Sequence, residues 1–179
     1  ICGKYNSLQD SYKSIIEAFV HAGVENNASI KVHWIDTEKL EQNLNSKDVF
    51  KNIDGILIPG GFGDRGIEGK ILSSQYAREN SIPFFGICLG LQCAIIDIAR
   101  NCCNLKGANS SEFNSKTKFP VVDLMPGQKN IKHKGASMRL GSYSCKLKSN
   151  TKVKSFYNKS TINERHRHRY EVNNKYVNL

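Results

Sequence analysis

Two short apolar runs, each followed by a glycine-containing turn and then by helical spacing, most strongly constrain how this chain can fold. The runs are residues 55–59 and 83–87, and both are as compact and apolar as strands that are buried on both faces. Helical spacing follows over residues 67–79 and again from Leu91 to Ile98. Strand and helix in alternation predict a mostly parallel sheet with helices on both faces. We therefore expect an α/β fold.

The first 35 residues extend this pattern. Ile1 to Gly3 reads as the end of a strand whose beginning is missing, and residues 30–35 read as a further strand. Between them lies one apolar helix stripe with spacing i, i+3, i+4, i+7, i+8, formed by Tyr12, Ile15, Ile16, Phe19 and Val20. We expect Ser7 or Asp10 to cap the start of this helix and Gly23 to end it.

The pattern changes after residue 113. Tyr143, Cys145 and Leu147 alternate with Ser and Lys, which predicts a half-exposed antiparallel strand, and residues 153–157 suggest another short element. No long Gly/Ser-rich or Pro-rich linker separates the two halves, and the sequence has no internal repeat. We expect residues 1–179 to form one domain, a parallel sheet with an antiparallel β appendage.

Composition excludes several classes of protein. Hydrophobic residues make up 39% of the chain and there are only 4 Pro, which excludes a disordered or collagen-like chain. No apolar run approaches the roughly 18 residues that a membrane-spanning helix needs, and the N-terminus has no signal-peptide pattern. The 6 Cys include no CxxC pair, so a four-Cys zinc site is not expected. Free thiols in a reducing cytoplasm are the better interpretation.

Positive charge is concentrated in the second half of the chain. Residues 1–113 hold 11 Lys+Arg against 13 Asp+Glu, a net of −2, and residues 114–179 hold 15 against 3, a net of +12. Such a block would suit nucleic acid, because Lys and Arg neutralise phosphates. The basic residues come in pieces such as 129–134 and 146–154, without a known nucleic-acid-binding pattern. We favour a solvated basic face that docks an acidic partner or a nucleotide, and no nucleic acid.

A candidate nucleophile lies where the strand at 83–87 becomes a helix. The turn is Gly86-Ile87-Cys88-Leu89-Gly90, the G-x-nucleophile-x-G pattern that strains and exposes its middle residue. At a helix N-terminus the backbone N–H groups favour the thiolate of Cys88, and the N–H of Leu89 would point at an oxyanion. The alternative is a buried structural Cys in a tight turn.

A second glycine-rich loop, residues 59–66, follows the strand at 55–59. Its consecutive glycines let the backbone approach a ligand or turn N–H groups toward an anion. The spacing matches neither GxGxxG nor the Walker pattern, so a phosphate cradle is the weaker interpretation. Because both loops would emerge at the carboxyl ends of neighbouring strands, we expect this loop to supply an oxyanion donor to Cys88.

These two loops together resemble the class I, triad-type glutamine amidotransferases. Three further segments resemble, more narrowly, the glutaminase domains of CTP synthases: residues 108–113, 138–141 and 164–173. The last of these, an alternating Arg/His string, is highly specific. The similarity covers nearly all of the chain and implies the flavodoxin-like α/β fold of that class.

The resemblance also implies roles for individual residues. Cys88 would attack the side-chain amide of glutamine, with the backbone N–H groups of Gly61 and Leu89 as the oxyanion hole. The substrate-binding residues that it implies are Gly61, Leu89, Gly90, Leu91, Gln92, Glu112 and Arg169. Among these, Gln92, Glu112 and Arg169 would hold the two ends of the substrate, since an Arg fork suits a carboxylate and an acidic side chain suits an ammonium group.

One departure from the family concerns the general base. The family's triad takes its His and Glu from an H-P-E segment, but none of the five histidines here is followed by Pro-Glu: His21, His33, His133, His166 and His168. We interpret His166 and His168 as neighbours that position Arg169 or meet a partner domain, with a role as substitute bases as the alternative. The chain is expected to be incomplete at both ends. The segment at residues 126–136 is also shorter than the linker expected there.

The resemblance implies partners as well. They are L-glutamine, a covalently linked synthetase domain that uses ATP and Mg²⁺, GTP as an allosteric activator, and a homotetramer of the full-length protein. No cofactor is expected in this domain. Three alternatives remain: a thiol hydrolase or chaperone with its Cys at the same kind of elbow, a basic nucleic-acid-binding module, and a degenerate amidotransferase used as a scaffold.

Overall fold

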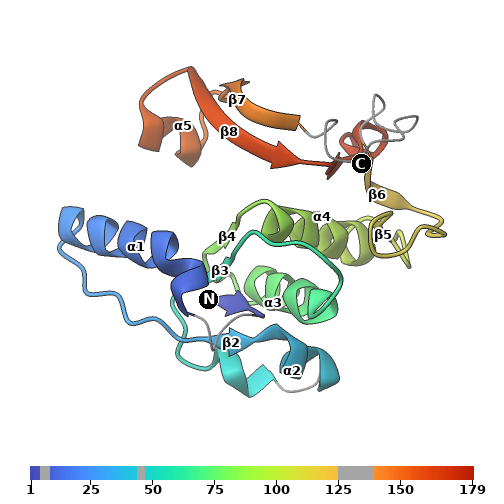
Figure 1. Cartoon of the computed structure of the whole chain (residues 1–179), viewed down its shortest axis with the longest axis horizontal. Coiled ribbons are helices and arrows are strands. Elements are labelled where there is room, and N and C mark those ends of the chain that lie inside the picture. The colour runs from blue at the N-terminus through green and yellow to red at the C-terminus, as the bar shows by residue number, and fades with distance from the viewer. Residues whose placement is uncertain (5–8, 44–46, 125–138) are drawn as a thin grey trace. The chain divides into compact units, whose positions relative to one another are not determined.

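The computed structural model describes residues 1–4, 9–43, 47–124 and 139–179 (Figure 1). The chain forms two compact units, the first made of Ile1–Asp123 with Val172–Leu179 and the second of Leu124–Glu171. Residues 126–136, where a longer linker was expected and residues were thought to be missing, lie outside the described residues.

Four parallel-paired strands organise the first unit. They are β1 (Cys2–Gly3), β2 (Ile35–Asp36), β3 (Ile56–Ile58) and β4 (Phe84–Gly86). β1 pairs with β2, and β3 pairs with β4 in a register that sets Ile58 opposite Gly86. The two strands predicted from apolar runs are thus confirmed. The strand predicted over 30–35 is wrong except at its last residue, because the described ladder of β2 involves only Ile35 and Asp36.

Two long helices cover one face of these strands. α3 (Ile67–Glu79) has the bounds predicted from the sequence, and α4 (Leu89–Asn101) begins two residues before the first apolar residue of its predicted helix. The helices pack on each other and on β3 and β4. The apolar core on this side includes Ile67, Ile71, Leu89, Cys93, Ile96 and Val121. Shorter helices lie along the chain: η1 (Gln9–Tyr12), α2 (Thr37–Gln42) and η2 (Lys47–Phe50).

Two ion pairs join α3 to α4, and sequence reasoning missed both. Arg78 donates from Nε and Nη2 to the two carboxylate oxygens of Asp97, each at 3.0 Å, and Asp97 is fully buried. Arg100 reaches Glu68 at 2.7 Å. Because a buried carboxylate is costly without its partner, these contacts fix how the two helices meet.

Helix α1 (Lys13–Glu25) departs from its predicted ends. Tyr12, not Asp10, is its N-cap, and no side chain caps it, because Asp10 lies within η1. Ser7, the other predicted cap, lies outside the described residues. The helix also runs two residues past Gly23, which is buried, so Gly23 does not end it.

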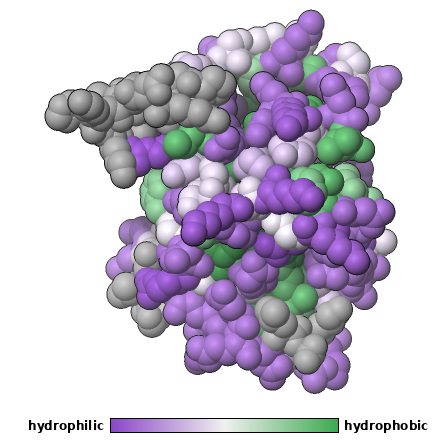
Figure 2. Space-filling view, turned by 90° about the vertical axis from the view of Figure 1, so that its right-hand side faces the viewer, coloured by the Kyte–Doolittle hydropathy of each residue, from purple (hydrophilic) through white to green (hydrophobic). Residues whose placement is uncertain are grey.

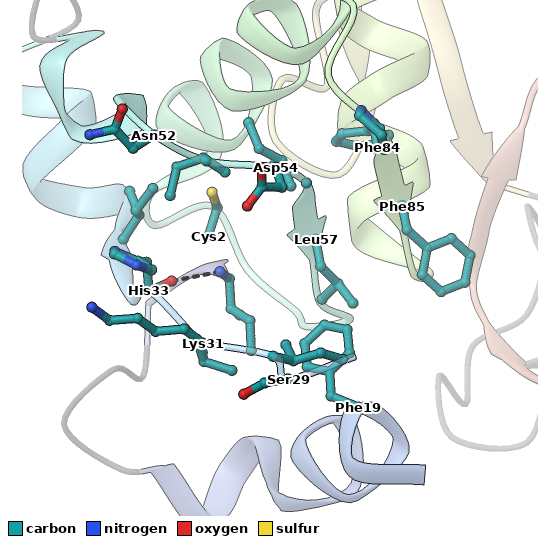
Figure 3. A pocket seen from close by; sticks show the side chains of 18 residues that line it. Cys2, Phe19, Ser29, Lys31, His33, Asn52, Asp54, Leu57, Phe84 and Phe85 are labelled. Atoms are coloured by element: carbon teal, nitrogen blue, oxygen red, sulfur yellow. Dashed lines mark hydrogen bonds between the residues drawn. The ribbon is translucent and has the colours of Figure 1, made fainter. Parts of the chain in front are cut away.

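A cavity of about 790 Å³ separates α1 from the strands (Figure 3). Phe19 of α1 lines it on one side, and Leu57, Phe84 and Phe85 line it from β3 and β4. Phe85 remains 63% exposed there. The second face of the sheet therefore has a helix opposite it, but that helix does not fill the space against the strands.

The second unit is built on an antiparallel pair. β7 (Arg139–Lys146) pairs with β8 (Thr161–His168), which confirms the predicted antiparallel appendage, and α5 (Lys152–Tyr157) is the short element expected at 153–157. In the first unit, β5 (Asn109–Ser110) pairs in parallel with β6 (Pro120–Leu124), and β9 (Tyr170–Val172) lies where the second unit ends along the chain. The last described turn is η4 (Asn174–Tyr176).

One face of the molecule is largely hydrophilic. On the face shown in Figure 2, hydrophilic side chains predominate and apolar residues are scattered among them. No helix in the described part of the chain has the length and apolar character to cross a membrane.

All six cysteines carry free thiols, and two of them, Cys2 and Cys93, are buried. Burial raises the pKa of Cys93 to about 12. Above pH 9 the unfolded chain releases this proton while the folded chain keeps it, so stability is lost as pH rises from 9 toward 12.

We therefore expect the free energy of unfolding to fall with alkaline pH less steeply in Cys93→Ala than in the wild type. The difference in slope should be about 1 kcal/mol per pH unit above pH 9, since one pKa unit corresponds to about 1.4 kcal/mol. Urea unfolding at pH 8, 9 and 10 measures it. Cys145→Ala, which removes an exposed thiol, serves as the control; equal slopes in all three proteins would contradict the prediction.

Candidate active site

Cys88 occupies a strained turn between β4 and α4. It is the N-cap of α4, with φ 54° and ψ −104°, a conformation that residues with a side chain rarely adopt. This confirms the strained elbow predicted from the G-x-C-x-G spacing. A strained residue of this kind persists only where the surrounding structure fixes it.

Two glycines make the turn sterically feasible. A Cβ on Gly86 would lie 2.5 Å from the carbonyl carbon of Gly90, and a Cβ on Gly90 would collide with the carbonyl oxygen of Ile58. Both contacts are with backbone atoms, which cannot rotate away as a side chain can. The first turn of α4 can therefore approach β3 and β4 this closely only with glycine at both positions.

Backbone hydrogen bonds hold the turn in place. The N–H of Ile87 donates to the carbonyl of Ile58 at 2.9 Å, which extends the β3–β4 pairing by one bond. The N–H of Gln92 donates to the carbonyl of Cys88 at 3.1 Å and closes the first turn of α4. Cys88 thus lies between a strand ladder and a helix that are both rigid.

The glycine-rich loop at 59–66 lies against Cys88. A Cβ on Gly60 would be 3.5 Å from the Cβ of Cys88, and one on Gly61 would be 3.4 Å from Cδ2 of Leu89. The backbone N–H groups of Gly61 and Leu89 both hydrogen-bond to the Cys88 thiol. The loop and the elbow therefore direct two backbone donors to one sulfur atom, as expected from their places at the ends of β3 and β4.

Two lysines anchor this loop through its carbonyls. Lys70 is 3% exposed, and its Nζ donates to the carbonyl oxygens of Arg65 at 3.4 Å and Gly66 at 3.3 Å. Lys4 donates to the carbonyl of Phe62 at 2.5 Å. Sequence reasoning missed both, although Lys70 stands out as a charged residue between the apolar Ile67 and Ile71 of α3.

Opposing effects set the pKa of the Cys88 thiol. Burial raises the pKa of its thiol, the N–H groups of Leu89 and Gly61 oppose that shift, and the charge of Glu112 adds to it. The backbone N–H groups thus favour the thiolate, as expected, but desolvation of the sulfur outweighs them and leaves the pKa of Cys88 raised.

We expect the rate of Cys88 alkylation by iodoacetamide to follow an apparent pKa above the ordinary thiol value. The thiolate is the reacting form, so a raised pKa keeps the rate low at neutral pH. Peptide mapping after timed exposure at pH 7 to 10 measures the rate for each cysteine. Glu112→Gln should lower the apparent pKa of Cys88, because it removes a negative charge. Fast alkylation at pH 7 would contradict the prediction.

The remaining predicted substrate-binding residues lie in several places. Gly90 and Gln92 are buried in the first turn of α4, and Leu91 is 49% exposed beside them. Glu112 is half-buried after β5, and its N–H donates to Oγ of Ser110 at 3.2 Å. Arg169 lies at the bend between β8 and β9 in the second unit. Within the first unit, the structure thus brings Gly61, Leu89 and the charge of Glu112 to Cys88.

Comparison with known proteins finds similar sequences over nearly the whole chain. Residues 7–178 match the family model described as glutamine amidotransferase class-I. The chain is similar to the CTP synthase of Chlorobaculum parvum, with 56% identity over 180 residues, and to that of Clostridium acetobutylicum, with 54% over 176. These matches cover 100% and 98% of this chain but 32% and 33% of the relatives, so the chain spans about a third of their length.

A solved structure is similar as well. It is the glutaminase domain of Trypanosoma brucei CTPS with bound acivicin, at 37% identity and a TM-score of 0.89. The match covers 99% of this chain and 68% of that one.

Proposed function

The chain belongs to the class I glutamine amidotransferases and, within them, to the glutaminase domains of CTP synthases, and we propose that Cys88 hydrolyses glutamine through a thioester. The single observation that carries this proposal is the convergence of the Gly61 and Leu89 N–H groups on the sulfur of a strained elbow cysteine. Two donors of this kind stabilise the oxygen that becomes negative when a carbonyl is attacked.

In the proposed reaction the sulfur of Cys88 attacks the side-chain carbonyl carbon of glutamine. The C–S bond forms, the thiol proton passes through a general base to the departing nitrogen, and the C–N bond breaks with release of ammonia. Water then hydrolyses the thioester to glutamate and regenerates the thiol. A base is needed because burial raises the pKa of the free thiol.

The ends of the substrate need charged partners. Glu112, whose charge reaches Cys88, suits the α-ammonium group, and the guanidinium of Arg169 suits the α-carboxylate. Gln92, buried in the first turn of α4, would add a polar contact beside the nucleophile, while Gly90 and Leu91 would line the site with backbone.

The ammonia would serve a linked synthetase domain. Because the relatives are about three times as long as this chain and are named CTP synthase, we assign to that domain the conversion of UTP to CTP with ATP and Mg²⁺. Activation by GTP, assembly as a homotetramer and a cytoplasmic location belong to the same proposal. The glutaminase domain itself would need no cofactor.

Labelling by a chloroketone analogue of glutamine tests the proposal. We expect Cys88 to react faster than the other five thiols at neutral pH, because the analogue binds beside it. Arg169→Ala should slow this labelling by roughly 30–150-fold, the equivalent of losing about 2–3 kcal/mol from a charge-assisted contact.

Iodoacetamide, which carries no amino-acid end, supplies the matched control. Arg169→Ala should leave its reaction with Cys88 unchanged. Chloroketone labelling of Cys93 or Cys145 with Cys88 spared would overturn the assignment of Cys88 as the nucleophile. Equal labelling rates in wild type and Arg169→Ala would show that Arg169 does not bind the substrate.

A further inference from the structure

Two histidines lie side by side on one face of β8. His166 and His168 point to the same side because side chains two residues apart in a strand share a face. Their Nδ1 atoms are 3.2 Å apart. Two nitrogens bound to one tetrahedral zinc ion are separated by about 3.3 Å, given Zn–N bonds of about 2.0–2.1 Å. The pair is thus already spaced as two ligands of one ion.

A carboxylate completes a set of three. Oε1 of Glu171 lies 3.8 Å from Nδ1 of His168, and the ligand atoms of His166, His168 and Glu171 all lie within 4.8 Å of one another. All three side chains are half-buried. Two imidazoles and one carboxylate are a donor set that binds zinc in proteins.

Arg139 holds the carboxylate from its other side. Its Nη1 lies 3.2 Å from Oε1 and 3.0 Å from Oε2 of Glu171. An ion that took Oε1 would leave Oε2 hydrogen-bonded to the guanidinium, and metal-bound carboxylates are commonly oriented by such partners. The nearby positive charge lowers affinity for a cation, so we expect binding in the micromolar range or weaker.

The neighbouring strand leaves room for an ion. Gly141 of β7 pairs with His166, and among the described residues, leaving aside its two chain neighbours, no atom lies within 4 Å of the position that a Cβ on Gly141 would take. Tyr143 contacts the His166 ring edge-on, at a centroid distance of 5.4 Å. The ring of His166 is thus oriented on one side, while the space over Gly141 is open to a water ligand.

We propose that His166, His168 and Glu171 form a binding site for a divalent transition-metal ion of the zinc type. Imidazole nitrogens select such ions over Mg²⁺ and Ca²⁺, which prefer oxygen ligands. The sequence analysis did not predict this site, because it considered only cysteine spacing as a signal for zinc. The proposal rests on the second unit alone and does not depend on the proposed glutaminase activity.

Titration of the 179-residue chain with Zn²⁺ against a competing metal indicator tests the site. Wild type should bind one equivalent, and both His168→Ala and Glu171→Gln should weaken binding by at least about 10-fold. Glu171→Gln keeps the shape of the side chain, so it remains informative if His168→Ala unfolds. His21→Ala, which removes an exposed histidine on α1, is the matched control and should bind as wild type does.

Thiols also bind zinc, so a second readout identifies the ligands. With Co²⁺ as the probe, the proposed site should give visible absorption without a thiolate charge-transfer band. Equal Zn²⁺ binding by wild type, His168→Ala and Glu171→Gln would overturn the proposal. A thiolate band that disappears on replacement of the exposed Cys102 and Cys145 by Ser would overturn it too, as would the absence of any binding to wild type at millimolar metal.

Discussion

Cys88→Ala should abolish glutamine hydrolysis and leave the fold intact. The backbone N–H groups of Gly61 and Leu89 donate to the sulfur of Cys88, and an alanine methyl group cannot form a thioester. Loss of a nucleophile typically costs on the order of 10⁴–10⁶-fold in kcat. Release of glutamate from glutamine, followed at saturating substrate, measures the loss.

The matched control for this experiment is Cys93→Ala. Cys93 lies one turn further along α4 and is fully buried in the core, so its replacement removes a thiol from the same helix without touching the elbow. It should lower stability and leave kcat nearly unchanged. Residual hydrolysis above about 1% of wild type in Cys88→Ala, with no contaminating glutaminase, would place the nucleophile elsewhere.

Gly90→Ala should destabilise the protein by about 3 kcal/mol or more, because the new methyl group would overlap the backbone carbonyl of Ile58. Relief of that overlap requires α4 to move away from β3, which also displaces Cys88 at its N-terminus. Urea unfolding measures the first effect. The rate of chloroketone labelling measures the second and should fall together with stability.

Gly55→Ala is the matched control for Gly90→Ala. A Cβ there would lie 3.7 Å from the carbonyl oxygen of Pro83, an ordinary contact. We expect it to change the free energy of unfolding by less than about 1 kcal/mol. If Gly90→Ala were as mild as Gly55→Ala, the close approach of α4 to β3 would not be needed for the elbow.

The elements that the sequence predicted well are those in which local pattern and tertiary contact agree. The runs at 56–58 and 84–86 are short, apolar and bounded by glycine or proline, and they pair with each other in the fold. The stretch at 30–34 has strand-like composition as well, but β2 begins only at Ile35, where pairing with Cys2 starts. Composition carries no information about which residues find a partner strand.

The residues at the centre of the candidate site could be predicted from the sequence, but the pKa of Cys88 could not. The G-x-C-x-G spacing identified Cys88, and the loop at 59–66 supplied the second donor as predicted. The direction of the Cys88 pKa shift could not be predicted, because it depends on how much protein surrounds the sulfur. The anchoring of the loop by Lys70 was also missed, although Arg65 and Gly66 lie only five and four residues before it, because apolar spacing does not show which carbonyls a buried amine contacts.

The raised pKa of Cys88 also bears on how fast peroxides oxidise this thiol while no substrate is bound. Peroxides oxidise thiolates far faster than thiols, and overoxidised cysteine is not recovered. A nucleophile that keeps its proton until a base removes it is therefore a poor target for oxidants while no glutamine is bound. The burial that raises the pKa of Cys88 would thus also slow the oxidation of this thiol by peroxides while no substrate is bound.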